Sequence, residues 1–177
     1  ALLDHAAELE MKASRIKKLS REVRKRIIIS ELVSSLAHED ERSVDLLRSA
    51  LLIARLDNED FDLETYLKKA ERLAEKIKLG FPQKATGEEK LRSLVSQLFQ
   101  EMGFHGSTLD YNHRSNSYMN EVLDDRGGLP ITLSVLFIEL ANRLDLPVSG
   151  LGLPGHFIAI YREPVPKSSE KKGKEIL

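Results

Sequence analysis

Two stretches near the C-terminal end decide the fold of this chain: "RGGLPITLSVLFIELANRL" at residues 126–144 and "GLGLPGHFIAIY" at residues 150–161. In the first, two glycines predict a tight turn. Pro130 stands at the first position of a helix, where proline is tolerated because the N–H that it lacks would have no hydrogen-bond partner there. The helix is expected to run to about Leu144. In the second, two apolar runs flank a Pro-Gly turn and predict a pair of short strands that carries His156. A buried helix whose N-terminus faces a strand histidine is the layout of a thiol–histidine enzyme, which also requires a nucleophile.

Composition excludes several kinds of site. The 177 residues suit one globular domain with or without a helical extension, and the formal net charge of −1 argues against obligatory nucleic-acid binding. Cysteine is absent, which excludes disulfides, thiolate metal sites and a thiol nucleophile, and is compatible with a reducing, intracellular location. No apolar run approaches the roughly 20 residues of a membrane span. His105 and His113 flank Asp110, but their spacing fits no zinc pattern, so neither a metal nor a cofactor is expected.

A long amphipathic segment opens the chain. Residues 2–38 carry apolar side chains at steps of three to five and contain neither glycine nor proline, which predicts one long helix or two helices with a break. Ser43 is expected to cap the next helix, which "DNEDFD" at residues 57–62 then ends.

Two further helices have clear start and stop signals. Asp62 is expected to cap a helix that stops at Gly80. Thr86 and Glu89 form a capping box that opens the next helix, which closes near Gly103. These signals predict a helical array ahead of the core.

The segment that follows prepares the core. Residues 105–117 are polar and are interpreted as a loop, and residues 118–125 as a short helix that ends at Gly127 and Gly128. The Pro-, Ser- and Lys-rich tail is expected to be mobile. Four units are predicted: a basic helical segment at 1–42, a helical subdomain at 43–105, a core at 106–163 and the tail at 164–177.

The core sequence resembles a known superfamily. "NSYMNEVLDDRGGLPITLSVLFIELANRLDLPVSGLGLPGHFIAIY" at residues 116–161 resembles the transglutaminase-like superfamily and, more narrowly, its SirB-type branch, named after a bacterial invasion regulator. The helical stretch "LLRSALLIARLDNEDFDLETYLKKAERLAEKI" at residues 46–77 also resembles that branch, although more loosely. The resemblance implies a predominantly helical α+β fold, with a helical array before a partial papain-like core and a small antiparallel sheet.

The resemblance also implies an altered catalytic site. Active relatives open the central helix with Gly-x-Cys and place a histidine on one strand and an aspartate on the next. In this chain Gly128-Leu129-Pro130 falls on Gly-x-Cys and His156 on the histidine, so the nucleophile position is proline, as is usual in the SirB-type branch. No aspartate follows Asp145; the orienting carboxylate either lies beyond Leu177 or is missing.

Other groups could serve a different chemistry. Thr132 lies about 200° round the helix axis from Pro130, and its side chain is expected to bond to the backbone or to fill the first turn. Ser134 is expected to be a small packing residue. His156 is either a relic held by a hydrogen bond beneath the helix or a contact for a ligand or partner, and general acid–base catalysis would need a second titratable group that cannot be placed.

A basic run on the first helix is the remaining candidate site. The stretch "KASRIKKLSREVRKR" at residues 12–26 is opposed only by Glu22 within it. Its long side chains either form a solvated helix face or dock an acidic protein surface, RNA or anionic lipid, with an acidic protein partner favoured. No aromatic residue is interleaved, so base stacking is not supported. The cationic residues are Lys12, Arg15, Lys17, Lys18, Arg21, Arg24, Lys25 and Arg26.

Three functions remain open at this point. The first is a non-catalytic transglutaminase-like protein that acts as an adaptor or regulator. The second is an enzyme of altered hydrolase or transferase chemistry that uses His156 with residues beyond the present C-terminus. The third is an RNA or anionic-surface binder that acts through the basic helix. The resemblance leaves the cytoplasm and the chloroplast stroma open, and periodicity alone does not decide the oligomeric state.

Overall fold

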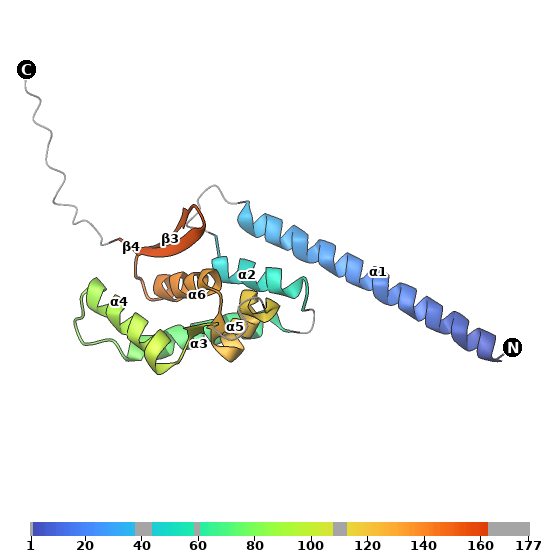
Figure 1. Cartoon of the computed structure of the whole chain (residues 1–177), viewed down its shortest axis with the longest axis horizontal. Coiled ribbons are helices and arrows are strands. Elements are labelled where there is room, and N and C mark those ends of the chain that lie inside the picture. Colours follow the sequence, from blue (N-terminus) through green and yellow to red (C-terminus); the bar gives the residue numbers. More distant parts are fainter. Residues whose placement is uncertain (1, 38–43, 59–60, 108–112, 163–177) are drawn as a thin grey trace, which may run out of the picture.

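The computed structural model describes residues 2–37, 44–58, 61–107 and 113–162. Within these residues no helix is long and apolar enough to cross a membrane. A long helix, α1, extends away from a globular part built from the remaining helices and a β-hairpin (Figure 1). The predicted class, a predominantly helical α+β fold with a small antiparallel sheet, is confirmed.

α1 spans Leu2–Leu36 as one unbroken helix, so the alternative of two helices with a break is wrong. Most of its length is exposed, and Ile28 is its one buried residue among those described. Leu32 packs on the core near α2, and the carboxylate of Glu31 accepts a 2.7 Å hydrogen bond from the guanidinium of Arg48. α1 therefore docks through its C-terminal turns and leaves its N-terminal turns without packing in the globular part.

The next three helices form the helical array. α2 spans Leu46–Arg55, α3 spans Leu63–Leu79, and α4 spans Gly87–Val95 and continues into the π turn η2, Ser96–Glu101. The Asp62 cap, the end at Gly80 and the capping box of Thr86 with Glu89 are confirmed. Gly103 adopts a left-handed φ of 73°, which glycine tolerates without strain, and the chain leaves the helix there as predicted.

The start of α2 differs from the prediction. Its N-cap is Asp45, whose side chain accepts from the Arg48 N–H at 2.8 Å, so the proposed cap at Ser43 is wrong; Ser43 itself lies outside the described residues. Asp and Ser serve almost equally well as caps, so sequence alone did not discriminate between two candidates that lie two residues apart.

A short parallel pairing precedes the central helix. β1, His105–Gly106, pairs with β2, Gly127–Gly128, and encloses the 3₁₀ turn η3, Arg114–Ser117, and α5, Met119–Asp125. The stretch predicted to be a loop therefore contains a strand and a helical turn. α5 ends at Arg126, which adopts a left-handed φ of 65°, rather than at the glycines that follow it.

α6, Pro130–Arg143, begins with proline at its first position, as predicted. β3, Val148–Leu153, returns and pairs antiparallel with β4, His156–Tyr161, and the hairpin lies against α6. An added Cβ at Gly150 would lie 2.9 Å from Cε2 of Phe157, so this strand position requires a glycine for the aromatic ring to pack. The core lies where α2, α3, α5 and α6 meet, around fully buried leucine, isoleucine and methionine side chains.

Candidate functional site

The turn before α6 is held by one carbonyl. The Asn116 oxygen accepts from the Leu129 N–H at 3.0 Å and from the Thr132 hydroxyl at 2.8 Å, and that hydroxyl also lies 3.0 Å from the Leu129 oxygen. Thr132 is 8% exposed. Its hydroxyl is engaged by two backbone carbonyls, that of Asn116 on η3 and that of Leu129 at the start of α6, and not by a histidine ring.

Gly128 brings this turn close to its neighbours. A Cβ there would lie 3.0 Å from Cγ2 of Val122 and 3.3 Å from Oγ1 of Thr132. Its carbonyl accepts from the Ser107 N–H at 3.1 Å, which adds a bond from the β1 side. The glycine turn therefore has a packing reason that is independent of any catalytic role.

The two residues that the resemblance assigns to the catalytic pair are both exposed. Pro130 opens α6, and its N-cap Leu129 makes no side-chain cap bond. His156 opens β4, pairs in register with Leu153, and makes no side-chain hydrogen bond or ion pair within the described residues. The expected relic bond beneath the helix is therefore not formed in this part of the chain, and the His156 ring is open to solvent.

Glu139 is a buried acid that the sequence reasoning missed. It is 7% exposed on α6, its Oε1 accepts from the Leu46 N–H at the start of α2 at 3.1 Å, and its Oε2 pairs with the Arg143 guanidinium. A carboxylate at a helix N-terminus meets free N–H groups and the positive end of the helix dipole. The signal in the sequence was a lone glutamate in the apolar run "LFIELA", four residues before an arginine.

A polar cluster joins three segments at the end of α2. Asp57 accepts from the Tyr118 hydroxyl at 2.5 Å and from the Arg114 guanidinium at 3.0 Å. The Tyr118 hydrogen bond, followed by Arg114 and by the charge of Lys25 on α1, lowers the pKa of the Asp57 carboxyl below its ordinary value. This cluster places a cation of α1 beside the globular part.

A second exposed cluster links α3 to α5. The Tyr66 hydroxyl donates to Asp124 at 2.6 Å, and Lys69 pairs with the same carboxylate at 2.5 Å. Burial, followed by the bond to Asp124, raises the pKa of Tyr66 to about 12. Burial would raise the pKa of Asp124, but hydrogen bonds from Lys69 and Tyr66 outweigh it and lower the pKa.

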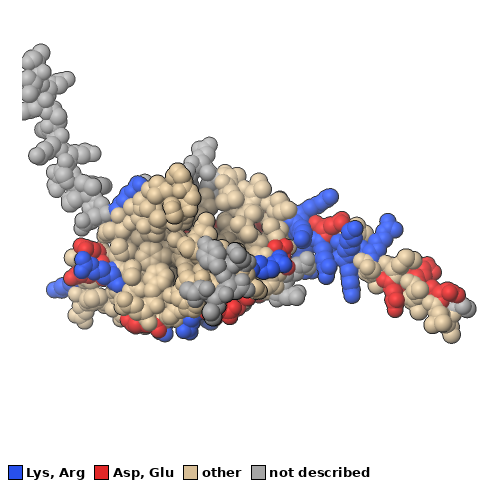
Figure 2. All heavy atoms as spheres, viewed as in Figure 1, with Lys and Arg blue, Asp and Glu red and all other residues tan. Residues whose placement is uncertain are grey.

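The basic surface of α1 comprises eight side chains, all exposed. Figure 2 shows Lys and Arg gathered on the part of α1 nearer the globular part, with Asp and Glu toward its N-terminal end. Glu22 is the only acid within residues 12–26, and Glu8, one turn before them, pairs with Lys12 at 2.6 Å. The members of the surface are Lys12, Arg15, Lys17, Lys18, Arg21, Arg24, Lys25 and Arg26.

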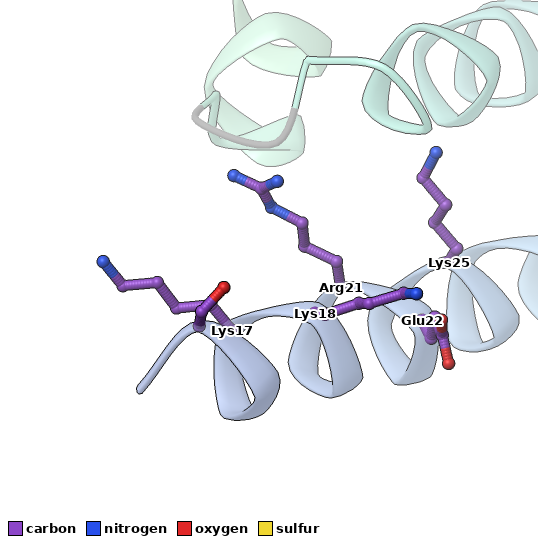
Figure 3. A pocket seen from close by; sticks show the side chains of 6 residues that line it. Lys17, Lys18, Arg21, Glu22 and Lys25 are labelled. Carbon is purple, nitrogen blue, oxygen red and sulfur yellow. The ribbon is translucent and has the colours of Figure 1, made fainter. Parts of the chain in front are cut away.

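An open hollow of about 440 Å³ lies along this surface. Figure 3 shows Arg21 and Lys25 extending from α1 toward the neighbouring ribbon, with Lys17, Lys18 and Glu22 along the helix. Four cationic side chains line the hollow with only one acid, Glu22, among them, which suits an anionic group. The hollow is shallow and lies on a single helix, so it suits a surface of a partner better than an enclosed small molecule.

Metal ligands do not converge in the part of the chain that the structure describes: no group of three His, Cys, Asp or Glu side chains is placed to hold an ion. His113 caps η3 by accepting from the Ser115 N–H, and His105 contacts the Gly106 carbonyl. Asp110, the third residue of the histidine loop, lies outside the described residues.

The fold and this site define a class of protein: an α+β core in which a glycine turn opens a central helix beside a β-hairpin that carries a histidine. A family model described as the transglutaminase-like superfamily matches residues 64–175. The chain belongs to this superfamily, as its core sequence predicted. No solved structure matches it.

Known relatives cover different shares of the chain. A UPF0162 protein of Xylella fastidiosa strain 9a5c is 34% identical over 131 residues, which are 74% of this chain and 47% of that protein. A UPF0162 protein of Vibrio cholerae is 26% identical over 124 residues, 70% of this chain and 46% of that protein. Human F-box only protein 21 is 36% identical over 61 residues, 34% of this chain and 10% of that protein. The chain thus spans about half the length of the bacterial relatives it matches.

Proposed function

We propose that this chain is a non-catalytic transglutaminase-like protein that acts as a protein-interaction adaptor or regulator and docks an acidic protein surface on the basic surface of α1. The observation that carries the proposal is the exposure of all eight cations of α1 in a chain whose overall net charge is −1. Charge concentrated on one extended helix attracts an oppositely charged surface at short range even where the whole protein is nearly neutral.

The residues at the start of α6 support the proposal that the protein is non-catalytic. Helix N-termini lower the pKa of a cysteine thiol and stabilise its thiolate, but the first residue of α6 is Pro130 and the chain has no cysteine. The nearest hydroxyl, that of Thr132, is buried and faces backbone carbonyls, so it lacks the base that would activate it.

The composition of α1 favours a protein partner over a nucleic acid. α1 contains no aromatic residue, so it offers no platform on which bases could stack. The location of the protein and the division into the four predicted units stay predictions.

The binding test uses two triple variants with the same change of charge. The first, Arg15→Glu, Lys18→Glu and Arg21→Glu, reverses the basic surface of α1. The second, Lys68→Glu, Arg72→Glu and Lys76→Glu, reverses three exposed cations of α3. Fluorescence anisotropy with a labelled polyglutamate peptide is expected to show binding that weakens at least about tenfold only in the α1 variant and that falls steeply with added salt.

Two outcomes would overturn the docking role. Equal binding of polyglutamate by both variants would place the contact elsewhere. Tighter binding of a single-stranded RNA or of anionic vesicles than of polyglutamate would favour the anionic-surface alternative.

Catalysis is tested separately. The purified chain is expected to release no ammonia from glutamine peptides and to hydrolyse no isopeptide bond. Activity that disappears in His156→Ala would end the non-catalytic proposal and favour the enzyme of altered chemistry.

A further inference from the structure

α1 carries a second feature that the proposed function does not use. Residues spaced seven positions apart form two rows that are apolar except for Ser20, which is the pattern of a coiled-coil seam. One row is large throughout, and the other is small until its last member. The large row is Leu2, Leu9, Ile16 and Val23; the second row is Ala6, Ala13, Ser20 and Ile27.

This seam has no partner among the described residues. Leu9 is 53% exposed, Ile16 67%, Val23 57% and Ile27 61%. The face of α1 that packs on the globular part is a different one, which carries Ile28 and Leu32. Exposed large apolar side chains in a row are characteristic of an interaction surface, and long helices obtain most of their stability from packing of such a face.

We infer that the seam pairs with the same seam of a second copy of this chain, with the two helices antiparallel. In the register that places Ala13 beside Ile16 of the copy, the neighbouring layers place Leu9 beside Ser20 and Ala6 beside Val23. Each of these layers joins a large residue to a small one, which fills space evenly. A parallel pair would place each residue beside its own copy, so that layers of two small side chains would alternate with layers of two large ones as far as residue 23.

The charges of α1 favour the same orientation. Asp4, Glu8 and Glu10 lie in its N-terminal turns, whereas the cations follow from residue 12 onward (Figure 2). Antiparallel pairing brings the acidic turns of one copy to the basic turns of the other. In the stated register, Glu10 and Lys17 flank the seam at facing positions, and the two-fold symmetry makes this pair twice.

The geometry of the chain permits this pairing. The overlap of residues 2–27 would be about 39 Å long at 1.5 Å per residue. Because the globular part is attached beyond residue 27, the two globular parts would lie at opposite ends of the paired helices (Figure 1). The seam itself shares no residue with the basic surface of α1, but Lys17 of that surface flanks it. Substitutions within the seam leave all eight cations in place and therefore test the pairing apart from the proposed docking role.

Sedimentation equilibrium of the full chain tests the pairing. The wild-type chain is expected to be a dimer in the micromolar range, and Ile16→Asp a monomer. Leu79→Asp, a change of the same kind at an 88% exposed residue outside α1, is expected to remain a dimer. A wild-type chain that is monomeric throughout this range would overturn the inference and leave the seam to another partner.

Charge exchange tests the register without a change in the seam. Glu10→Lys and Lys17→Glu, each alone, create two like-charged contacts and are expected to raise the dimer dissociation constant about tenfold. The double variant restores opposite charges and is expected to recover the wild-type constant. Single and double variants that dimerise equally well would contradict this register.

The cysteine-free background permits a test of orientation. In the antiparallel register, a mixture of the Ala6→Cys chain and the Val23→Cys chain is expected to form a disulfide-linked dimer under mild oxidation, and neither chain alone is expected to do so. Rapid linkage of each variant to itself would indicate a parallel pair and would overturn the stated arrangement.

Discussion

Glu139→Gln is expected to lower the free energy of unfolding by about 2 kcal/mol. The carboxylate accepts a charge-assisted hydrogen bond from the Leu46 N–H and pairs with Arg143, and its side chain is only 10% exposed. A glutamine can keep one acceptor toward the Leu46 N–H, but its NH₂ group would then face the Arg143 guanidinium. Two hydrogen-bond donors would face each other there, and the bond to Arg143 would be lost. Loss of one charged interaction and weakening of another, at about 1 to 2 kcal/mol each, produces this estimate.

The assay is urea unfolding followed by circular dichroism, in which a loss of this size lowers the midpoint by about 1 M. Glu88→Gln is the matched control, because Glu88 and Arg92 form the same i,i+4 pair on α4 with side chains 63% and 78% exposed. The control is expected to change stability by less than about 0.5 kcal/mol. Equal small losses in both variants would refute the reasoning that burial and the cap on α2 give Glu139 its role.

Three further predictions concern other parts of the molecule. Gly150→Ala is expected to destabilise the chain by about 2 kcal/mol, since the added methyl group would meet the ring of Phe157. Gly152→Ala places its methyl group in open space and should change thermal stability little. Equal effects of the two substitutions would contradict the packing argument. Pro130→Cys would introduce a single thiol at the start of α6. Its alkylation rate near neutral pH is expected to exceed that of a free thiol and to fall several-fold when His156→Ala is added. An alkylation rate that equals that of a free thiol and is unchanged by His156→Ala would show that the catalytic alignment is wrong. Folding raises the pKa of Tyr66 to about 12, so the contribution of Tyr66 to stability is complete below about pH 10 and is lost as the pH rises through about 12. Ultraviolet titration of the wild type and of Tyr66→Phe should show one tyrosine that ionises later than the others and is missing from the variant. Ionisation of Tyr66 near pH 10 would contradict this prediction.

Much of the local structure was predictable from short-range signals. The Asp62 cap, the Thr86 capping box and Pro130 at the head of α6 act within one turn of the chain, so their chemistry is visible in the sequence. The end of α5 was not predictable in this way, because Arg126 adopts the left-handed conformation there although two glycines stand next to it. Likewise, the pairing of β1 with β2 joins residues about twenty positions apart, and neither strand is long enough to show a period.

The candidate site divides in the same way. The absence of cysteine and the proline at residue 130 are facts of composition and order, and they leave no thiol at the start of α6. Which face of α1 packs on α2 could not be read from its sequence, because cations, alanines and large apolar residues occur on several of its faces. Amphipathic periodicity shows that a helix has an apolar side, but it does not say whether that side is buried in the same chain.

The order of residues therefore determined most of the helices, the caps at Asp62 and Thr86 and the hairpin, since each depends on neighbours within a few positions, and the composition determined the absence of a thiol. The tertiary structure alone decided that α1 projects with no described residue over its apolar seam, that Glu139 caps a helix 93 residues away, and that the Thr132 hydroxyl finds the carbonyl of Asn116, 16 positions earlier. These outcomes depend on which distant surfaces meet, and burial and long-range hydrogen bonds arise only once they do.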